Sequence, residues 1–302
     1  MKVNEVKKNK WIAGVSGGPD SMALLDIYKK QIIGVCHVNY HKRKDSNYDQ
    51  SLVENYCSLH KIPLAILNVK HQQYVSSKIN NFQALARKLR YDFFVKCSKK
   101  FKTKNLLIAH NLNDFLETAK MQEKRKSKNF FYGIRKKSLY KDLNVYRPLI
   151  LKFKADLVKY CQKNNVKYAI DSSNSSNIYE RNKIRKDLNA LSRKQLLLLK
   201  KKYDQRNKKY AKIEVKISHL LTIWQKENFS IKCLTGFNLS QKELDNLIYV
   251  YLKINKINNI NHSKILLVKD FIISKKVNQG LRIEHKKYLF KIKSKLVIKS
   301  FH

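Results

Sequence analysis

Residues 11–28 read WIAGVSGGPDSMALLDIY, and this stretch decides the fold. The apolar run at 11–15 predicts a short buried strand, and the apolar spacing across 22–28 predicts a helix. Between them, residues 14–19 contain three of the seven glycines of the chain and one of its three prolines. Such a concentration of glycine indicates a tight turn, so the stretch predicts a strand, a glycine-rich loop and a helix.

The chain that follows alternates between strand and helix patterns. Strands are expected at 31–38, 64–69 and 105–109, and helices at 49–60, 80–101 and 113–123. This alternation is typical of repeated βαβ units, which build a parallel sheet with helices on both faces. We therefore predict a doubly wound α/β domain. Its ligand is expected beyond the carboxyl ends of the strands, where Ser16, residues 37–39 and His110 fall.

The last third of the chain has a different pattern. Residues 191–227 are lysine-rich and helical, and 241–252 predicts another helix. The alternation at 281–299 predicts a terminal hairpin with Lys286 and Lys287 in its turn. A smaller, mainly helical second domain is the simplest interpretation, and we expect the two domains at 1–188 and 189–302.

The chain is strongly basic. Its 302 residues include 65 Lys and Arg against 22 Asp and Glu, which gives a formal net charge of +43. Such a charge favours a polyanionic partner, and a content of 11% aromatic residues indicates a folded chain rather than a disordered one. A/T-rich codons would also enrich Lys, Asn and Ile, so codon bias stays open as the source of part of the charge.

The cysteines show no pattern typical of a metal site. There are five of them, with no CxxC pair and no Cys/His cluster at ligand spacing. They indicate a reduced, cytoplasmic chain without zinc or an iron–sulfur cluster. No apolar run approaches the ~20 residues that span a bilayer, so no membrane partner is expected.

The glycine-rich loop consists of Ser16, Gly17, Gly18, Pro19, Asp20 and Ser21. Backbone N–H groups at the start of a helix bind anions, and glycine lets a phosphate approach the backbone closely. The serine hydroxyls can donate to phosphate oxygens, and Asp20 is a candidate ligand for Mg²⁺. The loop lacks the GxxxxGKS or GxxxxGKT pattern, and a plain capped turn is the alternative. The string SGGPDS resembles the loop of the N-type ATP pyrophosphatases, which implies that it binds ATP.

Five further strings follow in order along the chain. They are His37-Val38-Asn39, residues 81–91 (NFQALARKLRY), Ala109-His110 with Asp114 and Glu117-Thr118, Arg147-Pro148-Leu149, and residues 171–174 (DSSN) with Tyr179, Arg181, Asn182 and Arg185. In this order the strings resemble the tRNA(Ile)-lysidine synthase family, and the resemblance covers about residues 11–190. The chain departs from the family pattern at Gln83, Asn113, Phe115 and residues 124–128.

The resemblance implies an ATP-dependent ligase that joins the ε-amine of free L-lysine to C2 of the wobble cytidine of an isoleucine tRNA with a CAU anticodon. ATP and Mg²⁺ are the implied cofactors, and the cytidine is adenylated before lysine attacks. An ATP-dependent tRNA thiolase or a small-molecule synthetase with the same loop stays an alternative, as does a non-catalytic RNA-binding protein. The sequence leaves the oligomeric state open, with a homodimer as one alternative.

The expected catalytic residues are Asp20, Arg87, Asp114 and Glu117. Asp114 and Glu117 share a helix face because they are three residues apart. Asp20 and Asp114 are the expected metal ligands, and the alternative is that acids simply favour a helix N-terminus. Arg87 is expected to offset charge at the phosphates. His37, Asn39 and His110 are assigned to the nucleotide pocket, although both histidines also fit a buried, hydrogen-bonded role.

Basic residues interleaved with aromatic residues lie between residues 120 and 137. Cations neutralise phosphates and aromatic rings stack on unpaired bases, so this run is the expected site for an anticodon loop. A second basic run at 200–216 fits a phosphate backbone. A solvated lysine-rich face is the alternative for both runs. The expected RNA-binding residues are Arg90, Lys124, Arg125, Lys126, Phe131, Arg181 and Arg185.

Overall fold

In the computed structural model, the chain folds into two compact units. The first unit contains residues 1–121 and 133–199, and the second contains 122–132 and 200–302. The boundary expected from the sequence lies at residue 188, and the short segment 122–132 was expected in the first domain. The residues that the structure describes are 6, 9–42, 45–70, 82–125, 130–170, 180–258, 260–274 and 279–301.

The first unit is built on a six-stranded sheet with the strand order β3-β2-β1-β4-β6-β5. All neighbouring strands are parallel except β5 and β6, which form an antiparallel hairpin at the edge. This arrangement confirms the predicted doubly wound α/β fold. The strands are β1 (Trp11–Gly14), β2 (Ile32–Asn39), β3 (Leu64–Asn68), β4 (Asn105–Ile108), β5 (Lys137–Tyr140) and β6 (Leu143–Tyr146).

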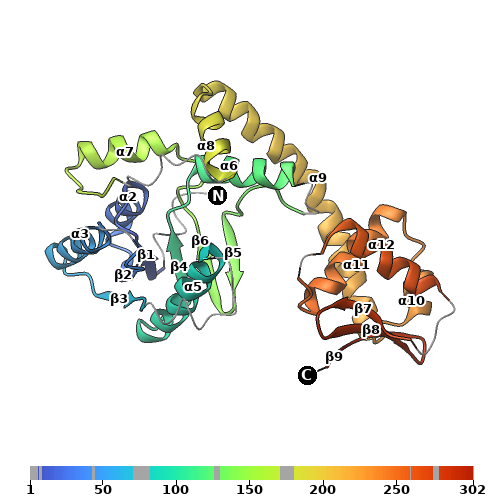
Figure 1. Cartoon of the computed structure of the whole chain (residues 1–302). Helices are drawn as coiled ribbons and strands as arrows, with labels where there is room; N and C mark the ends of the chain where they lie inside the picture. Colours follow the sequence, from blue (N-terminus) through green and yellow to red (C-terminus); the bar gives the residue numbers. More distant parts are fainter. Residues whose placement is uncertain are drawn as a thin grey trace. The chain divides into compact units, whose positions relative to one another are not determined.

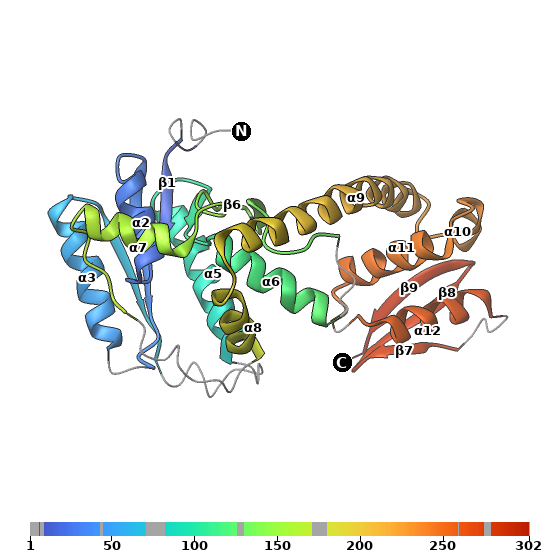
Figure 2. The same ribbon diagram turned by 90° about the horizontal axis from the view of Figure 1, so that it is seen from above.

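Helices cover both faces of this sheet, as Figures 1 and 2 show. The helices of the unit are α2 (Pro19–Tyr28), α3 (Ser46–Leu59), α5 (Phe82–Lys100), α6 (Leu112–Lys124) as far as Met121, α7 (Lys154–Lys163), α8 (Glu180–Asn189) and the beginning of α9 (Arg193–Lys226). Trp11 and Ala13 of β1 pack in one core with α2, α3 and α7, whereas Ile12 packs in a second core with α5. Because alternate residues of a strand face opposite sides, an apolar run such as β1 is what a sheet covered on both faces requires.

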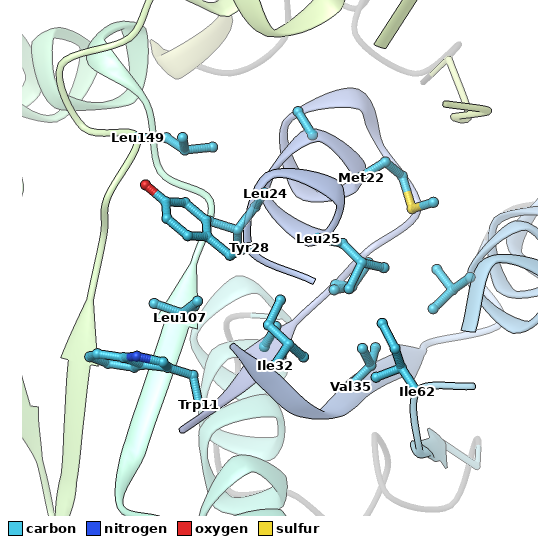
Figure 3. Close-up of a cluster of buried hydrophobic side chains, with 14 of the residues drawn as sticks. Trp11, Met22, Leu24, Leu25, Tyr28, Ile32, Val35, Ile62, Leu107 and Leu149 are labelled. Carbon is cyan, nitrogen blue, oxygen red and sulfur yellow. The ribbon is translucent and has the colours of Figure 1, made fainter. Parts of the chain in front are cut away.

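The core beneath α2 fixes where the glycine-rich loop begins. Figure 3 shows Met22, Leu25 and Tyr28 of α2 in one buried cluster with Ile32 and Leu107 of the sheet. Each of these side chains is at most 8% exposed. Truncating a buried leucine of this kind to alanine costs about 2–5 kcal/mol. The packed helix therefore holds its first turn firmly at the carboxyl end of β1.

The second unit is helical with one small antiparallel sheet. Its elements are the remainder of α9, α10 (Ile231–Gly236), α11 (Gln241–Ile254), α12 (His262–Ile273), β7 (Leu281–Glu284), β8 (Lys287–Ile292) and β9 (Lys295–Ser300). Trp224 of α9 is fully buried at the centre of its core, against Phe229 and Tyr251. Among the described residues of the chain, no helix has both the length and the apolar character needed to cross a bilayer.

The prediction of a single terminal hairpin is wrong, because the sheet has three strands in the order β7-β8-β9. Lys286 lies in the first turn as expected, but Lys287 already belongs to β8. The missed second turn is Lys293-Ser294, where both residues have positive φ angles of 48° and 58°. A two-residue turn of this kind usually carries Asn or Gly, and without them the alternation reads as one continuous strand.

Contacts within the second unit explain why segment 122–132 belongs to it. Tyr203 of α9 donates a hydrogen bond to the Glu123 carboxylate at 2.7 Å, and Arg206 forms an ion pair with the same group. The Asn207 side chain accepts from the Tyr132 backbone N–H at 2.7 Å and donates to its carbonyl at 3.0 Å. The segment is therefore tied to α9 by side chains that α9 supplies.

Candidate functional site

The loop between β1 and α2 requires glycine at position 17. Gly17 has a φ of +88°, and a Cβ there would lie 2.8 Å from the carbonyl oxygen of Asp49. The Gly17 carbonyl accepts a hydrogen bond from the Ala169 backbone N–H at 2.9 Å. Gly18 is the N-cap of α2 and Pro19 is its first residue. The backbone therefore turns sharply into the helix and presents the positive end of the helix dipole.

The two serines of the loop hold its shape. The Ser21 hydroxyl donates to the Gly18 carbonyl at 2.9 Å and accepts from the Ser16 backbone N–H at 3.1 Å. The Ser16 and Ser21 hydroxyls are 3.2 Å apart. The loop is thus closed by its own side chains, in a shape suited to an anion at the start of α2.

A cavity of about 210 Å³ opens beside this loop. It lies where β1, β2 and β4 end, which is the edge of the sheet that the doubly wound fold predicts for a ligand. The glycine-rich loop contributes part of its lining, and α5 contributes the aromatic side chains of Tyr91 and Phe94. The lining residues are Gly14, Val15, Ser16, Gly18, Asp20, Ser21, Cys36, Val38, Tyr40, Arg90, Tyr91, Phe94, Ile108, Ala109 and His110.

His37 and Asn39 do not line this cavity, although both were expected in the nucleotide pocket. They alternate along β2 with the lining residues Cys36 and Val38, so their side chains leave the opposite face. His37 Nδ1 is 3.0 Å from the Val15 carbonyl oxygen, and burial lowers the pKa of the ring. Asn39 donates to Gln50 at 2.9 Å and accepts from the His41 backbone N–H at 2.9 Å. The His37 side chain therefore braces the backbone just before the loop, and the Asn39 side chain braces the connection from β2 to α3.

Asp20 and Asp114 are neighbouring, half-buried carboxylates. Burial raises the pKa of Asp20 to about 6; Lys154 opposes the rise and the negative charge of Asp114 adds to it. Burial also raises the pKa of Asp114. Asp20 Oδ1 is buried and has no hydrogen-bond partner among the described residues. Two carboxylates that resist ionisation side by side, one with an unsatisfied oxygen, form a site that a cation would stabilise.

Asp114 also caps the helix on which it lies. Its Oδ2 accepts from the Asn111 backbone N–H at 2.9 Å, and Asn111 Oδ1 accepts from the Asp114 backbone N–H at 3.1 Å. This reciprocal pair is a capping box at the start of α6. Asp114 therefore has the helix-capping role that the sequence left open as an alternative, through its Oδ2. The same carboxylate also lies close enough to Asp20 to influence its charge.

Glu117 lies one turn further along α6 and is 3% exposed. Its carboxylate forms an ion pair with Arg181 and accepts from Arg185 Nε at 3.3 Å. Both arginines belong to α8, and their side chains are 41% and 34% exposed. The structure therefore brings an expected catalytic acid together with two residues expected to bind RNA.

Several guanidinium groups surround His110, which lines the cavity. Burial and the positive charges of Arg147, Arg90, Arg87 and Arg181 lower the pKa of His110 to about 3. The imidazole is therefore uncharged at neutral pH. Arg87 itself lies over the Tyr91 ring, 4.6 Å from its centroid, and its Nη2 is 3.5 Å from the Tyr91 hydroxyl.

Arg147 is a site residue to which the sequence reasoning gave no role. It is 4% exposed, and its Nε donates to His110 Nδ1 at 3.1 Å. The string Arg147-Pro148-Leu149 was the available signal, since an arginine between a strand and a proline is rarely buried without a partner.

The expected anticodon-loop run is only partly exposed. Lys124 and Arg125 are exposed, Phe131 is half-buried, and Lys126 lies outside the described residues. Phe130 packs edge-on against Tyr249, and Tyr132 stacks on Tyr203 with centroids 5.8 Å apart. These two aromatic residues therefore serve the second unit as packing groups. Asn81, residues 171–174 and Tyr179 also lie outside the described residues.

Replacing Asp20 with asparagine is expected to stabilise the magnesium-free protein at about pH 8, by on the order of 2 kcal/mol. Because the folded-state pKa of Asp20 is raised from 3.8 to about 6, its contribution to stability is present below the lower value and is lost as the pH rises through the higher one. The gain should therefore disappear near pH 4, which thermal denaturation at both pH values measures. Asp92→Asn should show no such gain, since Lys141 and Lys88 lower the pKa of Asp92.

The comparisons with known proteins agree with this geometry. Residues 1–191 match the model of the PP-loop domain family. The chain is 38% identical to the tRNA(Ile)-lysidine synthase of Ureaplasma parvum, over 95% of this chain and 86% of that protein. It is also 38% identical to the tRNA(Ile)-lysidine synthase of Malacoplasma penetrans, over 94% of this chain and 99% of that protein.

Among solved structures, the chain is similar to the U34-tRNA thiolase NcsA from Methanococcus maripaludis, which was solved with its 4Fe-4S cluster. That likeness has a TM-score of 0.54 at 18% identity and covers 69% of this chain and 77% of the thiolase, so it shows a shared fold. The match to the lysidine synthases extends through both compact units. The chain therefore belongs to the tRNA(Ile)-lysidine synthase family, with a PP-loop domain in its first 191 residues.

Proposed function

We propose that this protein is the ATP-dependent ligase that joins the ε-amine of free L-lysine to C2 of the wobble cytidine of the isoleucine tRNA with a CAU anticodon. The observation that carries the proposal is 38% identity to tRNA(Ile)-lysidine synthases over about 95% of the chain. The net charge of +43 supports a polyanionic substrate. The products are the modified tRNA, AMP and pyrophosphate.

The cavity is the proposed site for ATP. The phosphates would lie on the loop formed by residues 16–21, where the start of α2 and the serine hydroxyls attract anions. The base and ribose would lie deeper in the cavity, against the aromatic wall formed by Tyr91 and Phe94. Arg90 and His110 line the same cavity and can reach the oxygens of the bound nucleotide.

Mg²⁺ fits the residues on the loop side of the cavity. Asp20 and Asp114 would hold it, because burial raises the pKa of both carboxyl groups and one buried oxygen of Asp20 has no partner among the described residues. The ion supplies charge neutralisation at the phosphates. It would also lower the cost of keeping two neighbouring carboxylates ionised.

The proposed reaction has two steps. In the first, the C2 carbonyl oxygen of the cytidine attacks the α-phosphorus of ATP, and the bond from that phosphorus to pyrophosphate breaks. Arg90 in the cavity wall, and Arg87 nearby on α5, would offset the developing charge. In the second, the ε-amine of lysine attacks C2, loses a proton, and AMP leaves. Holding the amine against C2 supplies much of the acceleration.

Glu117 and its two arginines are proposed to organise the entrance for the RNA. Arg181 and Arg185 keep between a third and two fifths of their side chains exposed while they contact the Glu117 carboxylate. Their outward N–H groups remain suited to phosphate oxygens.

The test is to incubate the purified protein with ATP, Mg²⁺, lysine and unmodified isoleucine tRNA. Sustained pyrophosphate release is expected only when all three substrates are present, and mass spectrometry should find lysine on the wobble cytidine. Omitting lysine is the control for idle ATP cleavage. Sulfur transfer that needs no lysine would instead establish the thiolase alternative, for which the shared fold is the supporting observation.

A further inference from the structure

The hydrogen bond between Arg147 and His110 fixes more than the position of the imidazole. Arg147 Nε donates to His110 Nδ1 at 3.1 Å. A guanidinium group carries only donors and stays protonated in proteins, so the histidine nitrogen in this bond must be the acceptor. Nδ1 therefore carries no proton, and the proton of a neutral ring lies on Nε2.

The guanidinium is held in this orientation from a second direction. Its Nη1 donates to the Arg135 carbonyl at 2.9 Å and to the Ser138 hydroxyl at 2.9 Å. Ser138 lies on β5, and Arg147 directly follows β6. The antiparallel hairpin thus anchors one end of the guanidinium group and leaves Nε for His110.

The charges around His110 keep the ring neutral. Arg147 approaches it from the end of β6, Arg87 and Arg90 from α5, and Arg181 from α8. All four are cations, and together with burial they place the pKa of His110 near 3. A second proton would therefore bind only in strong acid, so the ring does not act as a general acid or base near neutral pH.

The remaining nitrogen is available to a ligand. Within the part of the chain that the structure describes, His110 Nε2 has no hydrogen-bond partner. Unlike His37 Nε2, it is not a fully buried atom. His110 lines the cavity together with Ser16, Asp20 and Arg90. A neutral N–H there recognises an acceptor without adding to the positive charge of the surrounding arginines.

We propose that Arg147 is a positioning residue, which holds the His110 imidazole neutral with its proton on Nε2 so that the ring donates a hydrogen bond to an acceptor oxygen of the bound nucleotide. The inference rests on the proposed use of ATP and is independent of the nucleophile that follows. It also explains what the edge hairpin contributes, since Ser138 of β5 and Arg135 just before β5 accept from the guanidinium of Arg147, which directly follows β6.

The first test is the nitrogen NMR spectrum of the full-length protein labelled with ¹⁵N-histidine, with His110→Asn used to assign the signal. The wild-type ring should show an unprotonated Nδ1 and a protonated Nε2 from about pH 6 to about pH 8. In Arg147→Met the two tautomers should mix. Arg147→Lys retains a positive charge and N–H donors, although without the planar fork, and should restore the wild-type pattern in part.

The second test separates ATP binding from the other substrates. Arg147→Met should raise the KM for ATP by about tenfold and leave the KM for lysine unchanged, since one hydrogen bond to the nucleotide is lost. Arg193→Met is the matched control, because Arg193 is a largely exposed arginine that pairs with Asp156 outside the cavity. It should change neither the spectrum nor the KM.

A wild-type ring protonated on Nδ1, or on both nitrogens, at about pH 7 would overturn the inference. An unchanged tautomer and an unchanged KM for ATP in Arg147→Met would do so as well. If that variant does not fold, the wild-type spectrum and Arg147→Lys decide. Calorimetry with ATP alone distinguishes failure of this inference from failure of the proposed ligase reaction. If the protein binds ATP and His110 has the expected tautomer, but no lysine is transferred to the tRNA, only the ligase reaction is refuted.

Discussion

Replacing Asp20 with asparagine is expected to slow pyrophosphate release by about a thousandfold while tRNA affinity stays unchanged. Asparagine fills the same space, but it has no charge with which to hold a cation beside Asp114. The buried Oδ1 of Asp20, which has no partner among the described residues, is the atom whose charge is lost. The rate is measured with saturating ATP, lysine and tRNA, and tRNA affinity by filter binding.

Asp92→Asn is the matched control for this variant. Asp92 lies on α5, where its carboxylate contacts Lys88 and Lys141 at the surface. Its removal should leave both the rate and the tRNA affinity intact. A rate in Asp20→Asn close to that of the parent would refute the role of Asp20. A parent protein that binds tRNA but never releases pyrophosphate would support the non-catalytic RNA-binding alternative.

The sequence predicts the glycine-rich loop well because its causes are local. The apolar run of β1, the concentration of glycine and the helical spacing of α2 all lie within eighteen consecutive residues. Gly17 needs its positive φ and Pro19 suits the first helical turn, and both preferences are properties of single residues. The cavity beside the loop then follows from the sheet order.

Residues whose roles depend on distant partners were harder to predict. His37 and His110 both lie near the ends of central strands, yet one faces the Val15 carbonyl and the other lines the cavity. The register of each strand decides between these outcomes. Arg147 acquires its role from Arg135, Ser138 and His110, and no spacing rule links these positions.

The roles of the aromatic residues near the basic run also depend on partners that are distant in the sequence. The sequence places Phe130 and Tyr132 among cations, which favours base stacking. In the structure both rings pack against aromatic residues of the second unit, at Tyr249 and Tyr203. An aromatic side chain can stack on a base or pack against another ring, and the fold determines which partner is present.

Replacing Glu117 with glutamine is expected to destabilise the protein by about 2–3 kcal/mol and to lower kcat by about a hundredfold. Glu117 is 3% exposed and is the shared partner of Arg181 and Arg185, so its loss removes the carboxylate that pairs with both guanidinium groups and leaves only the charge of Asp114 to offset them. Their repulsion should displace the start of α8 from α6. Thermal denaturation gives the stability change, and pyrophosphate release at a temperature where the variant is folded gives kcat.

Glu123→Gln is the matched control for this variant. Glu123 lies on the same helix and also pairs with an arginine, Arg206, so the substitution removes the same charge from a more exposed ion pair. The Glu123 side chain is 35% exposed, so its ion pair is screened and its loss should cost at most about 1 kcal/mol. Equal losses of unfolding free energy in the two variants would mean that the burial of Glu117 does not strengthen its ion pairs. A destabilised Glu117→Gln with normal kcat would confine Glu117 to a structural role, because arginines that shift without affecting turnover cannot be positioning the RNA.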